Sequence, residues 1–278
     1  MIKRLKAFLM YILVFVGGIL AAWAFWLEPS SLTTQRYSLT MAHKSNFSPL
    51  RIGIVSDIHI GRFFGDEKRL ERIVGTLNDE KPDIIVFLGD FVAQKSAEAF
   101  VKSAHQLKKL EAPLGVYAVL GNHDWWSGKT DVVQALTTNN VQLIDNQHID
   151  LNWKGAQLRL IGLGDYWEDE HMWDYIAAHK ASEIPSIAIT HNPDVFPRIP
   201  SDISLVLAGH THGGQVNFPI INSPIVPSQF QDRYRYGLIH EDDHHLLVTS
   251  GTGNSILPVR FRVPPEVVIA EVAFTSAN

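Results

Sequence analysis

Residues 51–59 read Arg51-Ile52-Gly53-Ile54-Val55-Ser56-Asp57-Ile58-His59, and this segment predicts the kind of fold. Its first part is an apolar run of strand length, and the run ends at two polar side chains, Asp57 and His59. The same pattern recurs twice, where residues 83–88 run into Gly89-Asp90 and residues 115–120 run into Gly121-Asn122-His123-Asp124. Open sheets with helical crossovers bind ligands at the carboxyl ends of their strands, so these polar side chains are expected to converge.

Two further clusters extend the set, because residues 186–190 end in His191-Asn192 and residues 203–208 end in Gly209-His210-Thr211-His212. In an extended segment residues i and i+2 point the same way, so each Asp-x-His or His-x-His pair is expected to present two ligands to one side. A carboxylate has two oxygens, which makes Asp90 the expected shared ligand. The converging Asp, Asn and His side chains suffice for two coordination spheres. Two ions about 3.5–4 Å apart can grip a phosphoryl group.

Hydrophobic periodicity places helices and further strands around these clusters. Residues 66–79 carry apolar side chains on one helical face, and helices are also expected over 96–110 and 168–180. Additional strands are expected near 141–144, 157–163, 186–190, 203–208, 236–240, 245–249 and 266–272. A βα repeat followed by a strand-rich half predicts an α/β fold in which two sheets pack together with helices outside.

Composition limits the chemistry. The 278 residues are 46% hydrophobic and 19% charged, which is typical of a globular protein. A net charge of -5 argues against a nucleic-acid partner, because binding a phosphate backbone needs a concentrated positive field. The chain has no cysteine, which excludes disulfides, thiolate metal sites and cysteine nucleophiles. Any metal is therefore held by oxygen and imidazole nitrogen, a donor set that suits Mn, Fe, Zn, Ni or Mg.

The N-terminus predicts a membrane segment. Lys3, Arg4 and Lys6 precede an uncharged run over residues 7–27, which as a helix spans about 31 Å, close to the hydrocarbon thickness of a bilayer. The competing interpretation is a cleaved signal peptide, since Ala22-Trp23-Ala24 has the Ala-x-Ala arrangement, but the run is longer than an ordinary signal core. The expected organisation is an anchor (or uncleaved signal) over 1–27, a polar connector over 28–49 and a catalytic domain over 50–278. Basic residues before the span predict a single-pass protein of the inner (cytoplasmic) membrane with its domain outside the cytoplasm.

The ordered blocks D-x-H, G-D, G-N-H-D, H and G-H-x-H resemble the calcineurin-like metallophosphoesterase superfamily, over about residue 51 to the C-terminus. The resemblance implies a two-sheet β-sandwich flanked by helices and two divalent metal ions, with Mn, Fe or Zn expected. It implies that Asp57, His59 and His212 bind the first metal, that Asn122, His191 and His210 bind the second, and that Asp90 bridges. It also implies that His123 protonates the leaving oxygen and that Asp124 orients His123.

A narrower resemblance concerns the membrane-associated branch of bacterial phosphodiesterases. It is carried by residues 209–215, Ser250-Gly251-Thr252-Gly253, Pro258-Val259-Arg260 and Pro264-Pro265-Glu266. Members of that branch are linked to UDP-2,3-diacylglucosamine hydrolysis in lipid A synthesis. The expected function is metal-dependent hydrolysis of a phosphodiester or phosphoanhydride in a membrane-associated substrate, and a lipid-linked phosphoester is the expected partner. UDP-2,3-diacylglucosamine hydrolase and a noncatalytic metal-binding membrane module remain alternatives, and a nuclease is disfavoured by the anchor and the acidic charge.

Several other polar and aromatic residues have two interpretations each. Asp165 is expected in a turn rather than at the site. Trp125, Trp126 and Trp167 follow strand-end turns, where they line a pocket, dip into the membrane surface or pack under a loop. Four arginines are weaker candidates for a phosphate clamp, with Arg260 preferred: Arg62, Arg233, Arg235 and Arg260.

Overall fold

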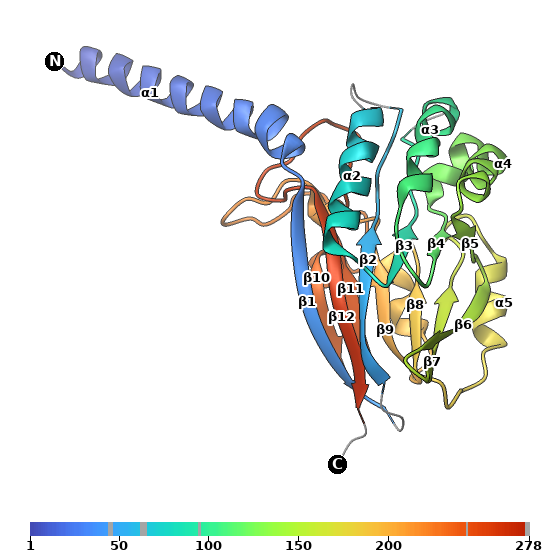
Figure 1. Cartoon of the computed structure of the whole chain (residues 1–278). Helices are drawn as coiled ribbons and strands as arrows, with labels where there is room; N and C mark the ends of the chain where they lie inside the picture. The colour runs from blue at the N-terminus through green and yellow to red at the C-terminus, as the bar shows by residue number, and fades with distance from the viewer. Residues whose placement is uncertain (44–46, 62–65, 94–95, 243, 276–278) are drawn as a thin grey trace.

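A computed structural model of the chain describes residues 1–278 apart from 44–46, 62–65, 94–95, 243 and 276–278. Two six-stranded sheets pack against each other, and helices cover their outer faces (Figure 1). A long N-terminal helix projects away from this body. The predicted two-sheet α/β fold with flanking helices is therefore confirmed.

The first sheet has the order β1-β12-β2-β3-β4-β5. Its strands are β1 (Thr33–Ala42), β2 (Phe47–Val55), β3 (Ile84–Leu88), β4 (Val116–Val119), β5 (Gln142–Leu143) and β12 (Glu266–Thr275). From β2 to β5 the strands are parallel, whereas β12 runs antiparallel to β2 and parallel to β1. The parallel part carries the first three polar clusters at one edge.

The second sheet has the order β10-β11-β9-β8-β7-β6. Its strands are β6 (Gln147–Trp153), β7 (Ala156–Gly162), β8 (Ser186–Ile189), β9 (Ile203–Ala208), β10 (Gly237–Glu241) and β11 (His244–Val248). The four central strands are parallel, and antiparallel β6 and β10 form the edges. The remaining two clusters, His191-Asn192 and Gly209 to His212, follow β8 and β9 directly.

Alternation along the strands builds a layered core. In β3, Ile84, Val86 and Leu88 face the second sheet, and Ile85 and Phe87 face the helices. Side chains of successive strand residues point to opposite faces, so a strand buried on both faces must be apolar throughout, as β3 is. The middle layer is thus made by the inner faces of both sheets, and each outer face needs a helical cover.

Helices supply that cover. The first sheet is covered by α2 (Asp66–Glu80), α3 (Glu98–Ser103), the 3-10 segment η3 (Ala104–Lys109) and α4 (Asn122–Thr138). The second sheet is covered by α5 (His171–Ala177) and the 3-10 segment η4 (Pro193–Arg198). In α2, Leu70, Ile73 and Leu77 are fully buried at helical spacing, which is the stripe expected from the sequence.

The structure differs from expectation in four elements. Strand β1 lies inside residues 28–49, which the sequence analysis treated as a polar connector, and it pairs with β12 over ten residues from Thr33↔Glu266 to Ala42↔Thr275. Its mixed polar and apolar residues gave no clear period because β1 is an edge strand, half exposed. Strand β6 and helix α4 were likewise not expected, and α5 is shorter than the predicted helix over 168–180.

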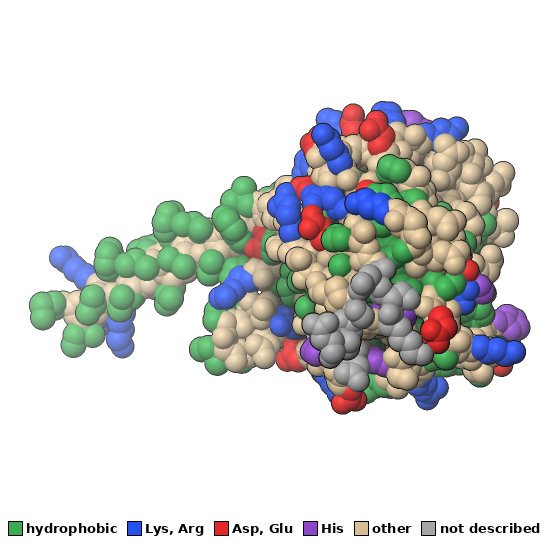
Figure 2. All heavy atoms as spheres, turned by 60° about the horizontal axis from the view of Figure 1, so that its bottom comes forward, with side chains coloured by type: hydrophobic (Ala, Val, Ile, Leu, Met, Phe, Trp, Pro, Cys, Tyr) green, Lys and Arg blue, Asp and Glu red, His purple; other side chains and the backbone are tan. Residues whose placement is uncertain are grey.

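The apolar N-terminal segment joins the body at a defined place. Helix α1 (Ile2–Ala22) continues into a π-helical turn η1 (Trp23–Leu27) and a 3-10 turn η2 (Glu28–Ser30). The segment Ile2–Ser30 is long and apolar enough to cross a membrane. Apolar side chains surround it on the visible face, and cationic side chains lie at its free end (Figure 2). The buried Glu28 carboxylate accepts hydrogen bonds from Trp23 Nε1 (2.6 Å) and Val263 N (2.5 Å), which fixes the helix end to the body.

The register of β1, β12 and β2 places the end of the N-terminal helical segment next to the polar clusters. Thr34 pairs with Val267, and the next residue of β12, Val268, pairs with Ile54 near the end of β2. The start of β1 and the end of β2 therefore lie at one edge of the sheet. Since Asp57 follows β2, the N-terminal helix leaves the body at the edge that carries the polar side chains (Figure 1).

A truncation tests the role of β1. We expect a fragment of residues 28–278 to be soluble and monomeric, and a fragment of residues 47–278 to aggregate, because losing β1 exposes the ten-residue edge of β12. Size-exclusion chromatography and circular dichroism of both fragments measure this. A monomeric 47–278 fragment with the melting temperature of the longer one would show that β1 is dispensable.

Candidate metal centre

The seven side chains expected to bind metal all lie together at one edge of the two sheets. Each is at most 5% exposed: Asp57, His59, Asp90, Asn122, His191, His210 and His212. Asp57, His59, Asp90 and Asn122 follow strands of the first sheet, and the histidines at 191, 210 and 212 follow strands of the second. The cluster thus exists only because the parallel parts of both sheets end at the same edge.

Three of these side chains form a first group around Asp57. His212 Nε2 lies 3.3 Å from Asp57 Oδ1 and 3.0 Å from His59 Nε2, and His59 Nε2 lies 3.9 Å from Asp57 Oδ1. For ligands about 2.0–2.2 Å from a common ion, mutual separations of about 3–3.5 Å are expected from tetrahedral or octahedral geometry. The separations within the first group are therefore close to those expected for three ligands of one metal ion.

A second group forms around His191. Its Nε2 lies 3.0 Å from His210 Nδ1 and 3.4 Å from Asp90 Oδ2. The Asp90, His191 and His210 atoms repeat the spacing of the first group with a different set of residues. Asn122 follows Gly121, which packs against the Asp90 carboxylate, and its buried Oδ1 has no hydrogen-bond partner.

Asp90 connects the two groups. Its Oδ2 lies 3.4 Å from His191 Nε2 in the second group and also 3.4 Å from His59 Nε2 in the first. Its Oδ1 accepts a hydrogen bond from the backbone N of His123 (2.9 Å), which holds the carboxylate plane in place. One carboxylate oxygen thus lies between the two groups.

The local backbone at these residues differs from the extended segment assumed from the sequence. Asp57 and His59 have φ of 54° and 50°, and His210 and His212 have φ of 68° and 52°. These values lie in the left-handed region, which costs energy for residues other than glycine and is concentrated at functional sites. As a result His210 and His212 do not act as a pair, because one joins His191 and the other joins His59.

Burial sets the protonation of the imidazoles. Burial lowers the pKa of His212 to about 4, and burial followed by the nearby His191 charge also lowers the pKa of His210 well below its usual range. For His191 burial acts in the same direction, but the charge and hydrogen bond of Asp90 outweigh it and raise the pKa to about 10. Burial raises the pKa of the Asp90 carboxyl, but the charge and hydrogen bond of His191 outweigh it and hold that pKa below its usual value.

Unpaired polar atoms test whether these residues fit a cation. Among the described residues, the buried oxygens Asp57 Oδ1 and Asn122 Oδ1 have no hydrogen-bond partner. Leaving a buried acceptor unsatisfied costs about 1–3 kcal/mol, so such atoms require a compensating partner. Two unpaired oxygens among close imidazole nitrogens form a donor set that fits divalent metal ions.

Backbone carbonyls orient two of the histidines. His191 Nδ1 donates to Leu88 O (2.7 Å), and His123 Nδ1 donates to Ala93 O (2.9 Å). In each ring the Nε2 atom is then left to face the site. His123 lies beside the first group, with its ring centroid 4.7 Å from that of His59. The sequence did not reveal these carbonyls, since any residue type can supply one.

Asp124 does not orient His123, contrary to the role implied by the family resemblance. Its buried carboxylate accepts backbone N–H bonds from four residues: Asp90 (2.9 Å), Phe91 (2.9 Å), Val92 (3.1 Å) and Gly121 (3.0 Å). These bonds tie the loop after β3 to the start of α4. Both oxygens of the Asp124 carboxylate accept hydrogen bonds from backbone N–H groups, and the His123 imidazole is oriented by Ala93 O instead.

The arginines proposed as a phosphate clamp have other roles. Arg260 is fully buried, and its guanidinium donates to the carbonyls of Ser250 (2.9 Å), Gly251 (3.2 Å) and Val263 (3.0 Å). It therefore organises the C-terminal loop and is not exposed to substrate. Arg233 binds Glu241 and Arg235 binds Asp232, while Arg62 lies outside the described residues.

Two tryptophans flank the centre. Trp126 is 54% exposed and lies 4.9 Å from His123, and Trp167 is 48% exposed and meets His210 edge to face at 4.5 Å. Their rings are nearly parallel at 6.4 Å, so two exposed aromatic faces stand over the site. Trp125 instead packs against the helix-covered core. Asp165 accepts from the backbone N of Trp167 and of Glu168, which confirms the predicted turn role.

Comparisons with known proteins agree with this geometry. The sequence profile described as calcineurin-like phosphoesterase matches residues 50–214. The chain is 30% identical to phosphodiesterase YaeI of Escherichia coli, with 88% of this chain and 90% of the relative covered, and 28% identical to the metallophosphoesterase YkuE of Bacillus subtilis, with 91% and 90% covered. It is 27% identical to the UDP-2,3-diacylglucosamine pyrophosphatase LpxG of Chlamydia trachomatis, with 71% and 74% covered.

Fold and site together define a metal-dependent phosphoester hydrolase. The chain belongs to the calcineurin-like phosphoesterase family. Its relatives include proteins named as phosphodiesterases and pyrophosphatases, so the matching residues are candidates for binding divalent metal ions.

Two glycine-to-alanine substitutions, one at the candidate metal centre and one away from it, test how closely the residues around Asp57 are packed. A Cβ at Gly209 would clash with Ser56 Oγ and lie 2.6 Å from Asp57 Oδ2, so Gly209→Ala should displace Asp57 and lower metal affinity by about 10- to 100-fold. In the control Gly75→Ala, nothing lies within 4 Å of the added carbon, and we expect full metal content with about 0.5–1 kcal/mol more stability. Bound metal per chain and thermal unfolding are measured for both, and equal metal content would contradict the close packing inferred at Gly209.

Proposed function

We propose that this chain binds two divalent metal ions and hydrolyses a phosphodiester or phosphoanhydride. The observation that carries the proposal is the position of Asp90 Oδ2, 3.4 Å from a histidine nitrogen in each of two separate groups. The group Asp57, His59 and His212 would hold one ion, and Asn122, His191 and His210 would hold the other, with Asp90 shared. The oxygen and imidazole donors favour Mn, Fe or Zn.

When bound, two such ions would polarise the phosphoryl group and make a water a stronger nucleophile. The chain itself contributes the proton for the leaving oxygen. His123 is fixed by Nδ1 donating to Ala93 O and by its backbone N donating to Asp90 Oδ1, so its free ring nitrogen has a set direction. A ring nitrogen of His123 lies within 4.8 Å of a ring nitrogen of His59 and of a carboxylate oxygen of Asp90. The imidazole is therefore within reach of a phosphoryl group bound at these residues. We assign His123 as the general acid.

The apolar segment Ile2–Ser30 anchors the enzyme as a single-pass protein of the inner membrane, with the catalytic domain outside the cytoplasm. Its length and composition support insertion, and Lys3, Arg4 and Lys6 at its free end support an orientation with that end inside. Retention is supported by the bonds that tie its end to the body, from Arg260 N to Ala24 O (2.9 Å) and from Val263 N to Glu28. Cleavage near Ala24 would break the first of them.

The substrate we propose is a phosphorus centre attached to an apolar group at the bilayer surface. The helix leaves the body at the edge that carries the metal centre, and the exposed faces of Trp126 and Trp167 stand beside that centre. The relative named UDP-2,3-diacylglucosamine pyrophosphatase acts on such a molecule, which keeps that activity as the named alternative. A UDP-linked substrate made on the cytoplasmic side is incompatible with the outward orientation, so only one of the two can hold.

A noncatalytic metal-binding module on the membrane is the candidate of another class. It would need the metal ligands but no oriented acid. The two hydrogen bonds that fix His123 beside the centre therefore favour the enzyme.

Two substitutions separate the acid from the ligands. His123→Asn should keep both metals and lose about 10²–10⁴-fold in rate on substrates with alkoxide leaving groups, and much less on nitrophenyl esters, whose leaving group needs little protonation. Asp90→Asn should lower metal content and slow every substrate alike, because it removes the shared carboxylate. Metal analysis and rates across leaving groups of different basicity measure both. Loss of a metal in His123→Asn, or equal slowing of all its substrates, would refute the acid assignment.

Orientation is tested with a reporter that matures only outside the cytoplasm, fused after Asn278 of the full chain. We expect an active reporter, an N-terminus that begins at Met1 or Ile2 by mass spectrometry, and a protein that stays in the membrane fraction after a carbonate wash. An inactive reporter, together with activity of a second reporter that matures only in the cytoplasm, would show the opposite orientation. That result would restore the UDP-linked alternative.

A further inference from the structure

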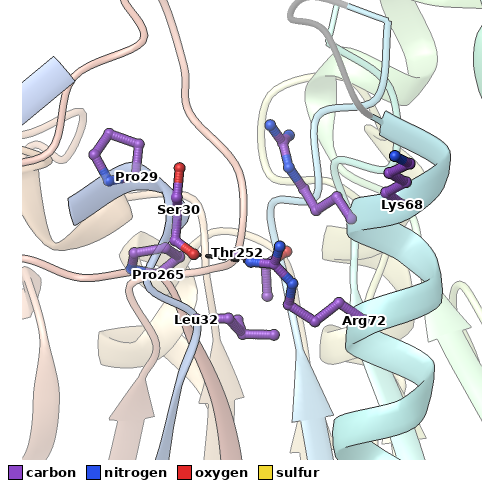
Figure 3. A pocket seen from close by; sticks show the side chains of 8 residues that line it. Pro29, Ser30, Leu32, Lys68, Arg72, Thr252 and Pro265 are labelled. Atoms are coloured by element: carbon purple, nitrogen blue, oxygen red, sulfur yellow. Dashed lines mark hydrogen bonds between the residues drawn. The ribbon is translucent and has the colours of Figure 1, made fainter. Parts of the chain in front are cut away.

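A pocket of about 220 Å³ opens where the apolar N-terminal segment meets the body. Pro29 and Ser30 form one wall, Lys68, Arg69 and Arg72 from α2 form the opposite wall, and Thr252 lies between them (Figure 3). The pocket is separate from the metal centre, since none of the seven candidate ligands lines it.

The pocket is strongly cationic. Three of its lining residues are basic, and none of the described lining residues is acidic. Arg72 Nη1 donates to Ser30 O at 2.8 Å, which holds the guanidinium in the pocket wall. Among the described residues this bond uses one of the five N–H donors of the guanidinium. Arg69 Nη1 donates to Ile58 O at 3.2 Å. Guanidinium groups match phosphate oxygens in charge and geometry, so the chemistry that fits here is a phosphate group.

The residues in the pocket wall indicate where the pocket lies relative to the bilayer. Pro29 and Ser30 end the segment that is long enough to cross a membrane, so the pocket lies at the level of the lipid headgroups when that segment is inserted. Exposed apolar side chains lie on neighbouring loops, with Ile220 at 93% and Ile256 at 66% exposure. These loops are tied together by the bond from Asn217 N to Phe261 O, and to the helix end by the bond from Arg260 N to Ala24 O. The surface around the helix exit is thus apolar beside a cationic pocket, as expected of a face that meets a bilayer.

We propose that this pocket binds the phosphate-bearing headgroup of an anionic phospholipid in the membrane that the helix enters. The inference rests on the membrane insertion proposed above, but not on the catalytic activity. Cations at a membrane surface attract anionic headgroups by about 1 kcal/mol each, and three cations around one cavity concentrate that attraction at a single headgroup.

Occupancy of the pocket would fix the orientation of the metal centre. Thr252 N donates to Ser56 O (3.0 Å) and Arg69 donates to Ile58 O, so two lining residues hold the backbone on both sides of Asp57. A single helix leaves a domain free to tilt, whereas a second contact at the headgroup level restricts that tilt. The lipid would therefore hold this edge of the sheets against the bilayer.

The test uses the full-length protein in detergent micelles, with phosphatidylglycerol and phosphatidylcholine as probes. Native mass spectrometry measures the dissociation constant of each lipid. We expect the wild-type chain to prefer phosphatidylglycerol, Lys68→Gln to weaken that preference roughly fivefold, and Lys68→Gln/Arg72→Gln to weaken it about 20- to 30-fold. The matched control Lys102→Gln/Lys108→Gln removes two exposed cations from α3 and η3, away from the pocket, and should keep the wild-type preference.

Three results would overturn the proposal. They are equal retention of both lipids by the wild-type chain, a preference that survives in Lys68→Gln/Arg72→Gln, and an equal loss in the control. Inorganic phosphate is added as a competitor, and displacement of the lipid by phosphate at the same concentration would identify a soluble ligand instead of a headgroup. Thermal unfolding checks that the double variant is folded. If it is not, the lipid preference of Lys68→Gln tests the proposal, because the Lys68 side chain is exposed and its loss should not disturb the fold. The carbonate wash tests the anchor independently, so failure of the anchor and failure of the pocket give different results.

Discussion

The shared position of the Asp90 carboxylate is the constraint on which the rest of the site depends. One oxygen lies 3.4 Å from a histidine nitrogen on each side, inside a cluster with almost no exposure to water. A buried carboxylate is stable only beside positive charge or strong donors, so this arrangement calls for cations at both sides. The loop that presents Asp90 is correspondingly rigid, because the Asp124 carboxylate binds the backbone N–H groups of residues 90 to 92.

The four-layer architecture explains how such a cluster can be assembled from distant segments. Parallel strands of both sheets end at one edge, and each delivers a short polar turn to the same small volume. The apolar residues behind the turns bury the strands on both faces, so the edge is held by two large cores and one interlayer core. Left-handed backbone at Asp57, His59, Asp90, His210 and His212 then turns the side chains inward, at an energetic cost that the cores can sustain.

The N-terminal segment, which is long and apolar enough to cross a membrane, enters the fold at the edge that carries the site. Strand β1 continues that segment and pairs with β12, which brings the helix end to the edge where β2 delivers Asp57. A catalytic centre and an apolar helix on opposite edges would face different environments. Their common edge, with a cationic pocket and exposed apolar loops around it, is what supports a surface-bound substrate and a bound headgroup.

The order of residues was enough to predict the class of fold, the seven candidate ligand side chains and the apolar N-terminal segment. Strand-length apolar runs ending in Asp, Asn and His carry that information locally, in residue order and period. The family resemblance already implied that His210 and His212 belong to different groups, as the structure places them. The tertiary structure was needed to show that Asp124 binds backbone N–H groups instead of His123 and that Arg260 is a buried support of the C-terminal loop. It alone placed β1 in the sheet and the pocket beside the helix. These features depend on backbone carbonyls, backbone N–H groups and strand register, which are the same for every residue type and leave no mark in the order of side chains.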